Sequence, residues 1–220
     1  MDKLIILGAG QHAKVIVSIV REFYGRKLEI AGYLDDNIAS GTKVLGFPVL
    51  GKLSDLSKSK NNRIANAAAI GISNRYMKLR EKLFLSLKTS GFRTPNLIHG
   101  KAFVSRFAIL GEGIVLNPLV SINAFAKLGN NIVVYSNATI EHETILEDNV
   151  YIGPGVNFSS NARVSRNTFI GAGAKIIPDI KIGSNVIVGA GSVVIKDIPN
   201  GVTAAGVPVK IISKSSRSRI

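Results

Sequence analysis

Residues 129–152 read GNNIVV-YSNATI-EHETIL-EDNVYI, and each six-residue unit of this stretch ends in an aliphatic residue. The same spacing of six continues without an insertion toward both ends of the chain. The apolar positions are Ile98, Val104, Leu110, Leu116, Ile122, Leu128, Val134, Ile140, Leu146, Ile152, Phe158, Val164, Ile170, Ile176, Ile182, Val188 and Val194. Because the helical period is 3.6 residues and the strand period is two, this spacing indicates a structural repeat rather than one long element.

A second set of positions, two residues before the first, carries small or β-branched side chains, as at Ala126, Ile132 and Ala138. Two buried positions in every six residues fit a short strand with one face toward a core, while the other residues turn a corner. Units of this kind stack into a parallel β-helix, in which hydrogen bonds join successive coils and aliphatic side chains fill the interior. The sequence therefore predicts a β-helix for the second half of the chain.

The first part of the chain follows a different pattern. An apolar run at 3–7 ends in Gly8-Ala9-Gly10, and apolar residues at helical spacing come next. Further strands are expected at 28–34 and 64–72, with a helix over about 74–90. Strands that alternate with helices are typical of a small parallel sheet covered by helices.

These patterns predict an α/β N-terminal domain with a small parallel, Rossmann-like sheet, followed by a parallel β-helix. The expected division is residues 1–95, residues 96–212 and a basic tail over 213–220.

Composition excludes several classes of protein. The 220 residues are 46% hydrophobic and 19% charged, as in a globular protein. The chain has no cysteine, which excludes disulfides, a thiolate nucleophile and Cys-ligated metal sites. The formal net charge of +14 suggests an anionic partner, but aromatic residues make up only 6% and tryptophan is absent, so we do not expect nucleic-acid binding. No apolar run is long enough to span a membrane and no signal peptide is recognisable, so a cytoplasmic protein without integral membrane association is expected.

The repeat resembles the hexapeptide-repeat acyltransferases. With the segment Gly8-Ala9-Gly10-Gln11-His12-Ala13-Lys14-Val15 in front of it, the chain is similar to the sialic acid O-acetyltransferase and bacillosamine N-acetyltransferase type. Further matches are Ile140-Glu141-His142-Glu143 within the repeat and Ala205-Gly206-Val207-Pro208 after it. The resemblance implies a left-handed β-helix with three six-residue units in each coil, a homotrimer, and acetyl-CoA as co-substrate.

His142 is one of three histidines in the chain, and it follows the core position Ile140 by two residues. That register places it at a corner with its side chain outward. The resemblance makes His142 the general base and Glu143 its orienting partner. It also suggests Ser160, one coil after His142 on the same corner, as the backbone N–H donor to the oxyanion, although Ser160 as a nucleophile activated by His142 is an alternative. A zinc carbonic anhydrase on a similar β-helix would need three His ligands, and only His142 lies inside the repeat, because His99 is at its first edge.

The resemblance places coenzyme A in a groove between adjacent copies of the β-helix. The expected contacts are Tyr151, Ser160, Ala172 and Ala190, and no metal is expected. Basic residues such as Lys175 and Lys196 are candidates for meeting the phosphates of coenzyme A.

The segment from Gly8 to Ala13 also fits the G-x-G-x-x-A pattern, in which a glycine turn brings backbone N–H groups to a phosphate at a helix N-terminus. Combined with the repeat, it predicts a nucleotide-linked amino sugar as the partner, although a purely structural turn is the alternative. The expected contacts with this substrate are Gly10, Gln11, His12, Asp35, Asp36 and Gly71.

Four positions depart from the family pattern, which commonly has Gly at Gln11, Asn at Tyr135, His at Tyr151 and Gly at Ser160. Our main hypothesis is an acetyl-CoA-dependent N-acetyltransferase that acts on a nucleotide-linked amino sugar for surface glycan biosynthesis. The alternatives are an O-acetyltransferase of a sialic-acid-like sugar and a non-enzymatic trimeric scaffold that binds a nucleotide.

Overall fold

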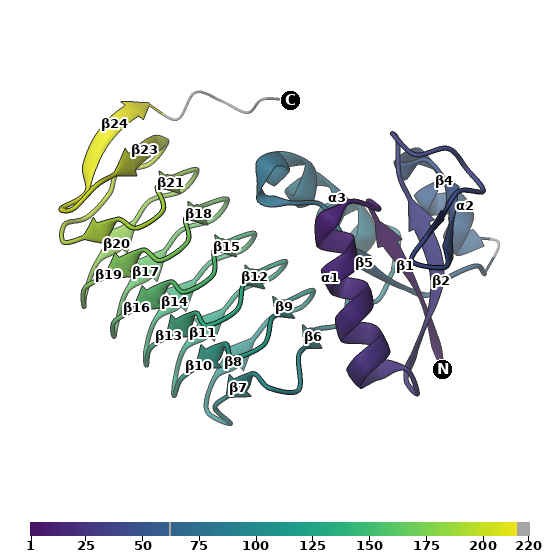
Figure 1. Ribbon diagram of the computed structural model, residues 1–220, viewed down its shortest axis with the longest axis horizontal. Helices are drawn as coiled ribbons and strands as arrows, with labels where there is room; N and C mark the ends of the chain where they lie inside the picture. The colour runs from purple at the N-terminus through teal and green to yellow at the C-terminus, as the bar shows by residue number, and fades with distance from the viewer. Residues whose placement is uncertain (62, 215–220) are drawn as a thin grey trace. The chain divides into compact units, whose positions relative to one another are not determined.

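The computed structural model describes residues 1–61 and 63–214. It divides into two compact units, one spanning Met1–Leu97 and one beginning at Ile98 (Figure 1).

The first unit contains a five-stranded sheet in the order β3-β4-β2-β1-β5. The strands β1, β2, β4 and β5 pair in parallel, whereas β3 and β4 form an antiparallel hairpin at the edge. The predicted parallel sheet is therefore confirmed. The strand bounds are Asp2–Leu7 (β1), Leu28–Leu34 (β2), Lys43–Val44 (β3), Phe47–Gly51 (β4) and Ala67–Ile70 (β5).

Helices cover both faces of this sheet. Ile5 and Leu7 of β1 share a buried cluster with residues of α2 and α3, whereas Ile6 points toward Ala13 of α1 on the opposite face. The bounds are Gln11–Ile19 (α1), continued by a π-helical turn at Val20–Tyr24 (η1), Leu53–Asp55 (η2), Leu56–Asn61 (α2), Asn74–Tyr76 (η3) and Met77–Thr89 (α3).

The second unit is a left-handed parallel β-helix, as expected. Seventeen two-residue strands each end at one of the predicted apolar positions. They are Leu97–Ile98 (β6), Phe103–Val104 (β7), Ile109–Leu110 (β8), Val115–Leu116 (β9), Ser121–Ile122 (β10), Lys127–Leu128 (β11), Val133–Val134 (β12), Thr139–Ile140 (β13), Ile145–Leu146 (β14), Tyr151–Ile152 (β15), Asn157–Phe158 (β16), Arg163–Val164 (β17), Phe169–Ile170 (β18), Lys175–Ile176 (β19), Lys181–Ile182 (β20), Ile187–Val188 (β21) and Val193–Val194 (β22).

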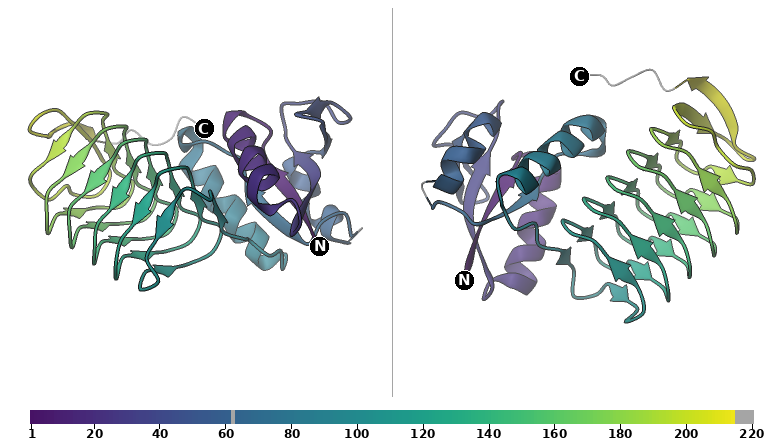
Figure 2. Two further views of the ribbon diagram at one scale, coloured as in Figure 1. Left: turned by 60° about the horizontal axis from the view of Figure 1, so that its bottom comes forward. Right: turned by 180° about the vertical axis from the view of Figure 1, so that it is seen from behind.

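Every third strand pairs in parallel, so the β-helix has three faces. Sheet I runs from β7 to β22, sheet II from β8 to β20, and sheet III from β6 through β21 to the closing strands Val202–Ala205 (β23) and Lys210–Lys214 (β24). Paired residues lie 18 apart, as for Thr139 with Asn157. One coil is therefore three six-residue units, and Figure 2 shows the coils stacked one on the next.

The interior is a continuous column of aliphatic side chains, as the six-residue period predicts. Ile122, Ile140 and Phe158 follow one another on sheet I, and each is at most 1% exposed. This column forms one buried cluster that extends as far as Ala204.

Three edges join the sheets, and we name each edge by the sheets it connects. Edge I–II holds residues 141–144 and the corners one coil before and after them, edge II–III holds 147–150 and its equivalents, and edge III–I holds 153–156 and its equivalents.

At the corners between residues 111 and 192, one residue in each corner has a positive φ. Most of these residues are Gly, Asn or Asp, the types that adopt left-handed backbone with the least strain. Three exceptions carry larger side chains: Leu119 on edge III–I, with φ of 61°, and Phe125 and Glu143 on edge I–II, with φ of 63° and 62°. The full set is Gly113, Leu119, Phe125, Asn131, Asn137, Glu143, Asn149, Gly155, Asn161, Asn167, Gly173, Asp179, Asn185 and Gly191.

The C-terminal end of the β-helix departs from this strict register. Ile198 pairs with Ile182, a separation of 16, and β24 turns back antiparallel to β23. The strand β24 includes Ser213 and Lys214, the first two residues of the predicted basic tail, and residues 215–220 lie outside the described residues.

Replacing Phe158 by Ala should lower the free energy of unfolding by about 3–5 kcal/mol, because the change removes a buried ring and leaves a cavity in the column. Urea unfolding followed by circular dichroism at fixed protein concentration would measure the effect. Lys175→Ala, at an exposed position on the same sheet, should change stability by less than about 0.5 kcal/mol. A loss below about 1 kcal/mol for Phe158→Ala would contradict a tightly packed column.

Candidate functional site

His142 and Glu143 lie in the corner of edge I–II between β13 and β14. The His142 Nδ1 atom is 3.6 Å from a carboxylate oxygen of Glu143, and the two side chains are 53% and 61% exposed. With Nδ1 facing the carboxylate, Nε2 is the ring atom left to take up a proton from a ligand.

The two glutamates that flank His142 differ in their contacts. The Glu141 carboxylate accepts hydrogen bonds from Asn123 Nδ2 at 2.9 Å and from the backbone N–H of His142 at 3.3 Å. Glu143 instead faces the imidazole, from a backbone conformation that is strained for glutamate. Glu141 therefore stabilises the corner, and Glu143 is the carboxylate that is in position to orient the ring.

Ser160 lies on the same edge, one coil after His142. The backbone N–H of Asn161 donates to the His142 carbonyl at 3.0 Å, and that of Asp179 donates to the Ser160 carbonyl at 3.2 Å, so these corners stack directly. The Ser160 N–H itself donates to no other residue within 1–61 and 63–214. It is therefore available to a ligand near His142.

Ala172 and Ala190 lie together on a different edge, III–I. Both are exposed, and the Gly191 N–H donates to the Ala172 carbonyl at 2.8 Å, which stacks the two corners. A Cβ atom on Gly171 would lie 2.5 Å from the Ala190 nitrogen, so glycine is needed for this close approach. Within the described chain, the N–H groups of both alanines make no hydrogen bond, so they are available to a ligand.

The structure therefore brings His142, Glu143 and Ser160 together, and separately brings Ala172 and Ala190 together. The two groups lie on different edges of one β-helix, because His142 and Ala172 are five six-residue units apart and a coil contains three. A ligand that must touch both groups cannot do so along a single edge.

Tyr151 lies in β15 rather than at a corner, and it is 4% exposed. Its hydroxyl donates to the Tyr135 hydroxyl at 3.0 Å, and the two ring centroids are 5.5 Å apart. Its ring also contacts Phe169 edge-on at 6.0 Å. The Tyr151 hydroxyl is thus already hydrogen-bonded to Tyr135, and both residues are positions at which the chain departs from the family pattern.

The glycine turn of the first unit lies at the carboxyl ends of its parallel strands. The Gly8 N–H donates to the Leu34 carbonyl and the Gly71 N–H donates to the Leu7 carbonyl, both at 2.7 Å. A Cβ on Gly71 would lie 2.7 Å from the Gly8 oxygen and 2.8 Å from the Ala13 Cβ, so Gly71 permits the close packing of turn and helix. Gly10 and Gln11 are exposed at the start of α1 and can face a ligand.

Asp35 and Asp36 follow β2 at the same edge of the sheet, and both support the backbone. Asp35 accepts hydrogen bonds from the N–H groups of Ala9, at 2.8 Å, and of Asn37, also at 2.8 Å. Asp36 accepts one from the Leu53 N–H at 2.9 Å. The two carboxylates therefore hold the loops around the glycine turn, and Asp36 remains exposed.

His12 differs from its neighbours in the turn because its side chain is buried, with 2% exposed. Burial, and secondarily the positive charge of Arg80, lower its pKa to about 3, so the ring is neutral at physiological pH. Arg80 of α3 is 1% exposed and donates to the Ile72 carbonyl at 2.6 Å. The sequence analysis missed this buried cation, because an arginine within a helix is normally exposed and no local pattern marked it.

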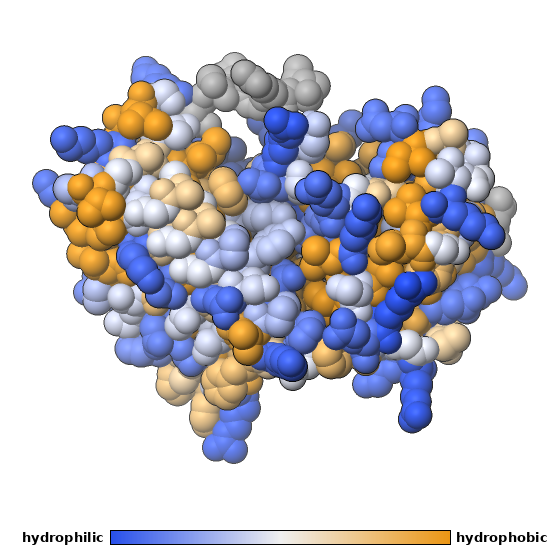
Figure 3. Space-filling view, viewed as in Figure 1, coloured by the Kyte–Doolittle hydropathy of each residue, from blue (hydrophilic) through white to orange (hydrophobic). Residues whose placement is uncertain are grey.

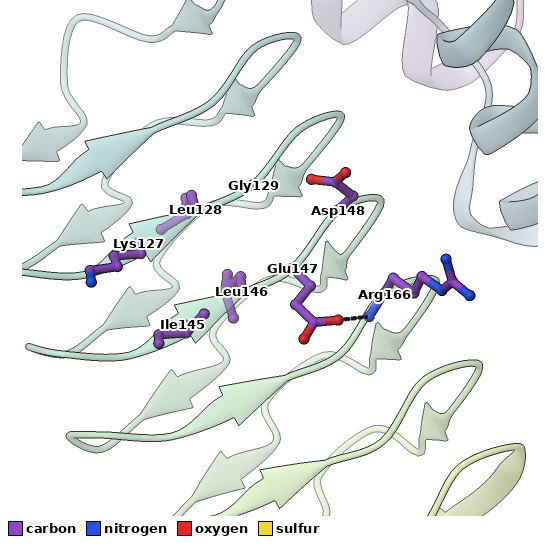
Figure 4. A pocket seen from close by; sticks show the side chains of 8 residues that line it. All are labelled: Lys127, Leu128, Gly129, Ile145, Leu146, Glu147, Asp148 and Arg166. Atoms are coloured by element: carbon purple, nitrogen blue, oxygen red, sulfur yellow. Dashed lines mark hydrogen bonds between the residues drawn. The ribbon is translucent and has the colours of Figure 1, made fainter.

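A shallow depression on sheet II and edge II–III contains none of the predicted site residues. Figure 4 shows the Glu147 carboxylate directed at the backbone of Arg166, whose N–H it accepts at 3.0 Å. Asp148 similarly accepts the Asn130 N–H at 2.7 Å. Both carboxylates are thus occupied by the backbone. The lining residues are Lys127, Leu128, Gly129, Ile145, Leu146, Glu147, Asp148 and Arg166.

Two further features bear on the class of protein. Over residues 1–61 and 63–214, no three His, Asp or Glu side chains gather as a set of metal ligands. No helix in that part of the chain has the length and apolar character needed to cross a membrane.

Residues 3–87 match the family described as PglD N-terminal domain, and residues 161–196 match the bacterial transferase hexapeptide family. No curated protein sequence matches the chain significantly.

Solved structures match almost the whole chain. PerB from Caulobacter crescentus, in complex with CoA and GDP-perosamine, is 33% identical with a TM-score of 0.87, over 96% of this chain and 97% of that one. The acetyltransferase domain of PglB from Neisseria gonorrhoeae, in complex with acetyl coenzyme A, is 33% identical with a TM-score of 0.86, over 96% and 99%. WeeI from Acinetobacter baumannii is 27% identical with a TM-score of 0.83, over 95% and 99%.

Lowering the pH should destabilise the protein through His12. The depressed pKa means that the unfolded state binds a proton more readily, so stability is complete above about pH 6.5 and falls toward pH 3. We expect His12 to account for a loss of about 2 kcal/mol in unfolding free energy between pH 7 and pH 5. Urea unfolding at several pH values would show a shallower pH slope in His12→Gln, whereas Lys14→Ala, exposed on the same helix, should retain it. Equal slopes in His12→Gln and the parent would contradict the assignment.

Replacing Glu143 by Asn should raise the free energy of unfolding by about 1 kcal/mol, because asparagine adopts left-handed backbone with less strain. The reverse change at an exposed corner with similar backbone, Asn137→Glu, should lower it by a similar amount. Thermal unfolding of the two variants beside the parent would measure both effects. A less stable Glu143→Asn would mean that the Glu143 side chain stabilises the fold by more than the backbone strain.

Proposed function

The chain belongs to the family of hexapeptide-repeat sugar acetyltransferases and is an acetyl-CoA-dependent acyltransferase, and we propose that His142 is its general base. We infer that the acceptor is the amine of a nucleotide-linked amino sugar, because PerB, similar over nearly its full length, binds GDP-perosamine together with CoA. The observation that carries the assignment of His142 is its exposed position beside Glu143, a residue kept in strained backbone.

His142 Nε2 removes a proton from the sugar nitrogen as that nitrogen attacks the thioester carbonyl. Glu143 acts as a positioning residue, because its carboxylate faces Nδ1 and favours the tautomer with Nε2 free. The Ser160 N–H donates to the oxygen that becomes negative in the tetrahedral intermediate. Collapse of that intermediate releases the thiolate of coenzyme A, whose parent thiol has a pKa of about 8.5, so no strong acid is required. Because the acceptor attacks directly, a covalent intermediate on Ser160 is unnecessary.

Coenzyme A is proposed to lie along edge III–I, on the outward N–H groups of Ala172 and Ala190. Tyr151 lies on the adjoining sheet III, where its ring supports this edge through Tyr135. Since His142 is on edge I–II, cofactor and base meet only if edge III–I of one chain faces edge I–II of another. The separation of the two groups supports our proposal of a homotrimer with three equivalent sites. Lys175 and Lys196 are exposed beyond His142 along the coils and are suited to the phosphates of coenzyme A.

The nucleotide sugar is assigned to the first domain, residues 1–95. Its diphosphate is proposed to approach the exposed turn at Gly10 and Gln11, where the start of α1 favours an anion. Asp35 and Asp36 are assigned to the base or ribose side of the ligand. Buried His12, together with Gly71, shapes the turn from beneath. We further propose that the enzyme acts in the cytoplasm, where acetyl-CoA is available, and contributes to surface glycan assembly.

His142→Ala should lower kcat by about 10²- to 10⁴-fold with little change in affinity for coenzyme A, because the variant loses the base and no cofactor contact. The melting temperature should be unchanged, since the imidazole is exposed. Thiol release from acetyl-CoA with a panel of nucleotide-linked amino sugars is the assay. His99→Gln, whose imidazole accepts the Lys101 N–H in another corner, is the control and should retain activity.

Full activity in His142→Ala would contradict the assigned base. Product analysis by mass spectrometry distinguishes the acceptors: an amide supports N-acetylation, whereas an ester on a sialic-acid-like sugar would replace it by O-acetylation. Thiol release with none of the sugars would overturn the proposed substrate class.

A further inference from the structure

The first coils of the β-helix expose several large apolar side chains, and Figure 3 shows apolar surface at the lower end of the β-helix. Phe107 is 51% exposed, Phe125 56% and Leu119 59%. The Phe107 and Phe125 rings stack on successive corners of edge I–II, with centroids 5.5 Å apart, and the Arg106 guanidinium lies 4.7 Å from the Phe107 centroid. Leu119 stands on edge III–I.

Backbone conformation sets Leu119 and Phe125 apart from equivalent corners. Both occupy left-handed positions that elsewhere hold Gly, Asn or Asp, apart from Glu143. An exposed side chain makes no contact within its own chain that would offset the backbone strain. The exposure of a large apolar side chain to water is also unfavourable. The combination indicates that the two side chains stabilise something outside their own β-helix.

Leu119 lies at a height along the β-helix axis between those of Phe107 and Phe125. Successive coils are about 4.8 Å apart, and each rises evenly over its three units, so Leu119 stands about 3 Å beyond Phe107 and about 2 Å short of Phe125. Leu119 is therefore level with the middle of the ring pair, on a different edge. A three-fold axis parallel to the β-helix leaves levels unchanged between copies, so the Leu119 of one copy would meet the ring pair of its neighbour.

We propose that Leu119 of one chain packs against the outer edges of the stacked Phe107 and Phe125 rings of the next, and that three such contacts close the trimer. The inference rests on the proposed function, which requires edge III–I of one chain to face edge I–II of another. Phe125 is one coil before Glu143 on the same edge, so the apolar contact lies next to the position where cofactor and base must meet. The contact thus sets the level at which the neighbour's cofactor edge faces His142.

Leu119→Asn and Phe125→Asn test this contact, because asparagine is at ease in left-handed backbone and should leave the fold of each chain intact. Sedimentation velocity over a dilution series should show each variant with a trimer dissociation constant at least 10-fold higher than that of the parent. The double variant should be little weaker than either single variant, because both changes remove the same contact. Phe103→Asn, at 57% exposure but on the face of sheet I, is the matched control and should assemble like the parent.

A charge exchange supplies a second measurement. Leu119→Lys and Phe125→Glu should each weaken the trimer, and a chain that carries both changes should regain at least part of its stability. A trimeric parent whose assembly is unaffected by Leu119→Asn and Phe125→Asn would overturn this contact and leave the proposed function intact. A parent that is an active monomer would overturn the shared-site arrangement itself.

Discussion

Hydrogen bonding between successive coils is the constraint on which the second half of this protein depends. Each coil offers its backbone N–H groups to the carbonyls of a neighbouring coil, as Tyr151 does to Thr168 and Asn161 does to His142. The bonds satisfy a backbone that has neither long strands nor helices, and they hold the period of three units along the stack. Because of that period, the position of an outward side chain on a given edge follows from its residue number.

Left-handed corners are the second demand of this geometry. From Gly113 to Gly191 one occurs at every sixth residue, and Gly, Asn and Asp adopt this backbone with little strain. Glu143, Leu119 and Phe125 adopt this backbone with more strain. We therefore infer that the residues at these three corners serve chemistry or association, whereas the residues at the other corners serve the fold. The strained corners lie in the early coils, close to the proposed base, and the later coils between Ser160 and Gly191 keep the relaxed types.

The β-helix could be predicted from sequence because its repeat is local and strict, and each predicted apolar position ends a strand. The stacking of His142 with Ser160 followed from the same arithmetic. The site of the first domain was harder to predict from sequence, because it depends on contacts between distant segments of the chain. His12 is buried near Arg80, whose charge contributes to its lowered pKa, and the Asp35 carboxylate accepts the N–H of Ala9; in both cases the two residues are far apart in sequence. The strained corners were not predicted, because the six-residue pattern identifies the corners but not which corner residues have left-handed backbone.

The strict length of the coil also limits how this protein can change in length. Inserting one residue inside a strand would rotate every later side chain out of its face, moving aliphatic groups outward and charged groups into the column. An insertion of one whole coil between Ser160 and Ala172 would preserve all three faces and shift the later edge by about 4.8 Å. The distance along the β-helix between the corner of the proposed base and the corner of the proposed cofactor contacts can thus change only in steps of one coil. Evolution can adjust such a site in whole coils, or by exchanging side chains at corners, but not by gradual lengthening.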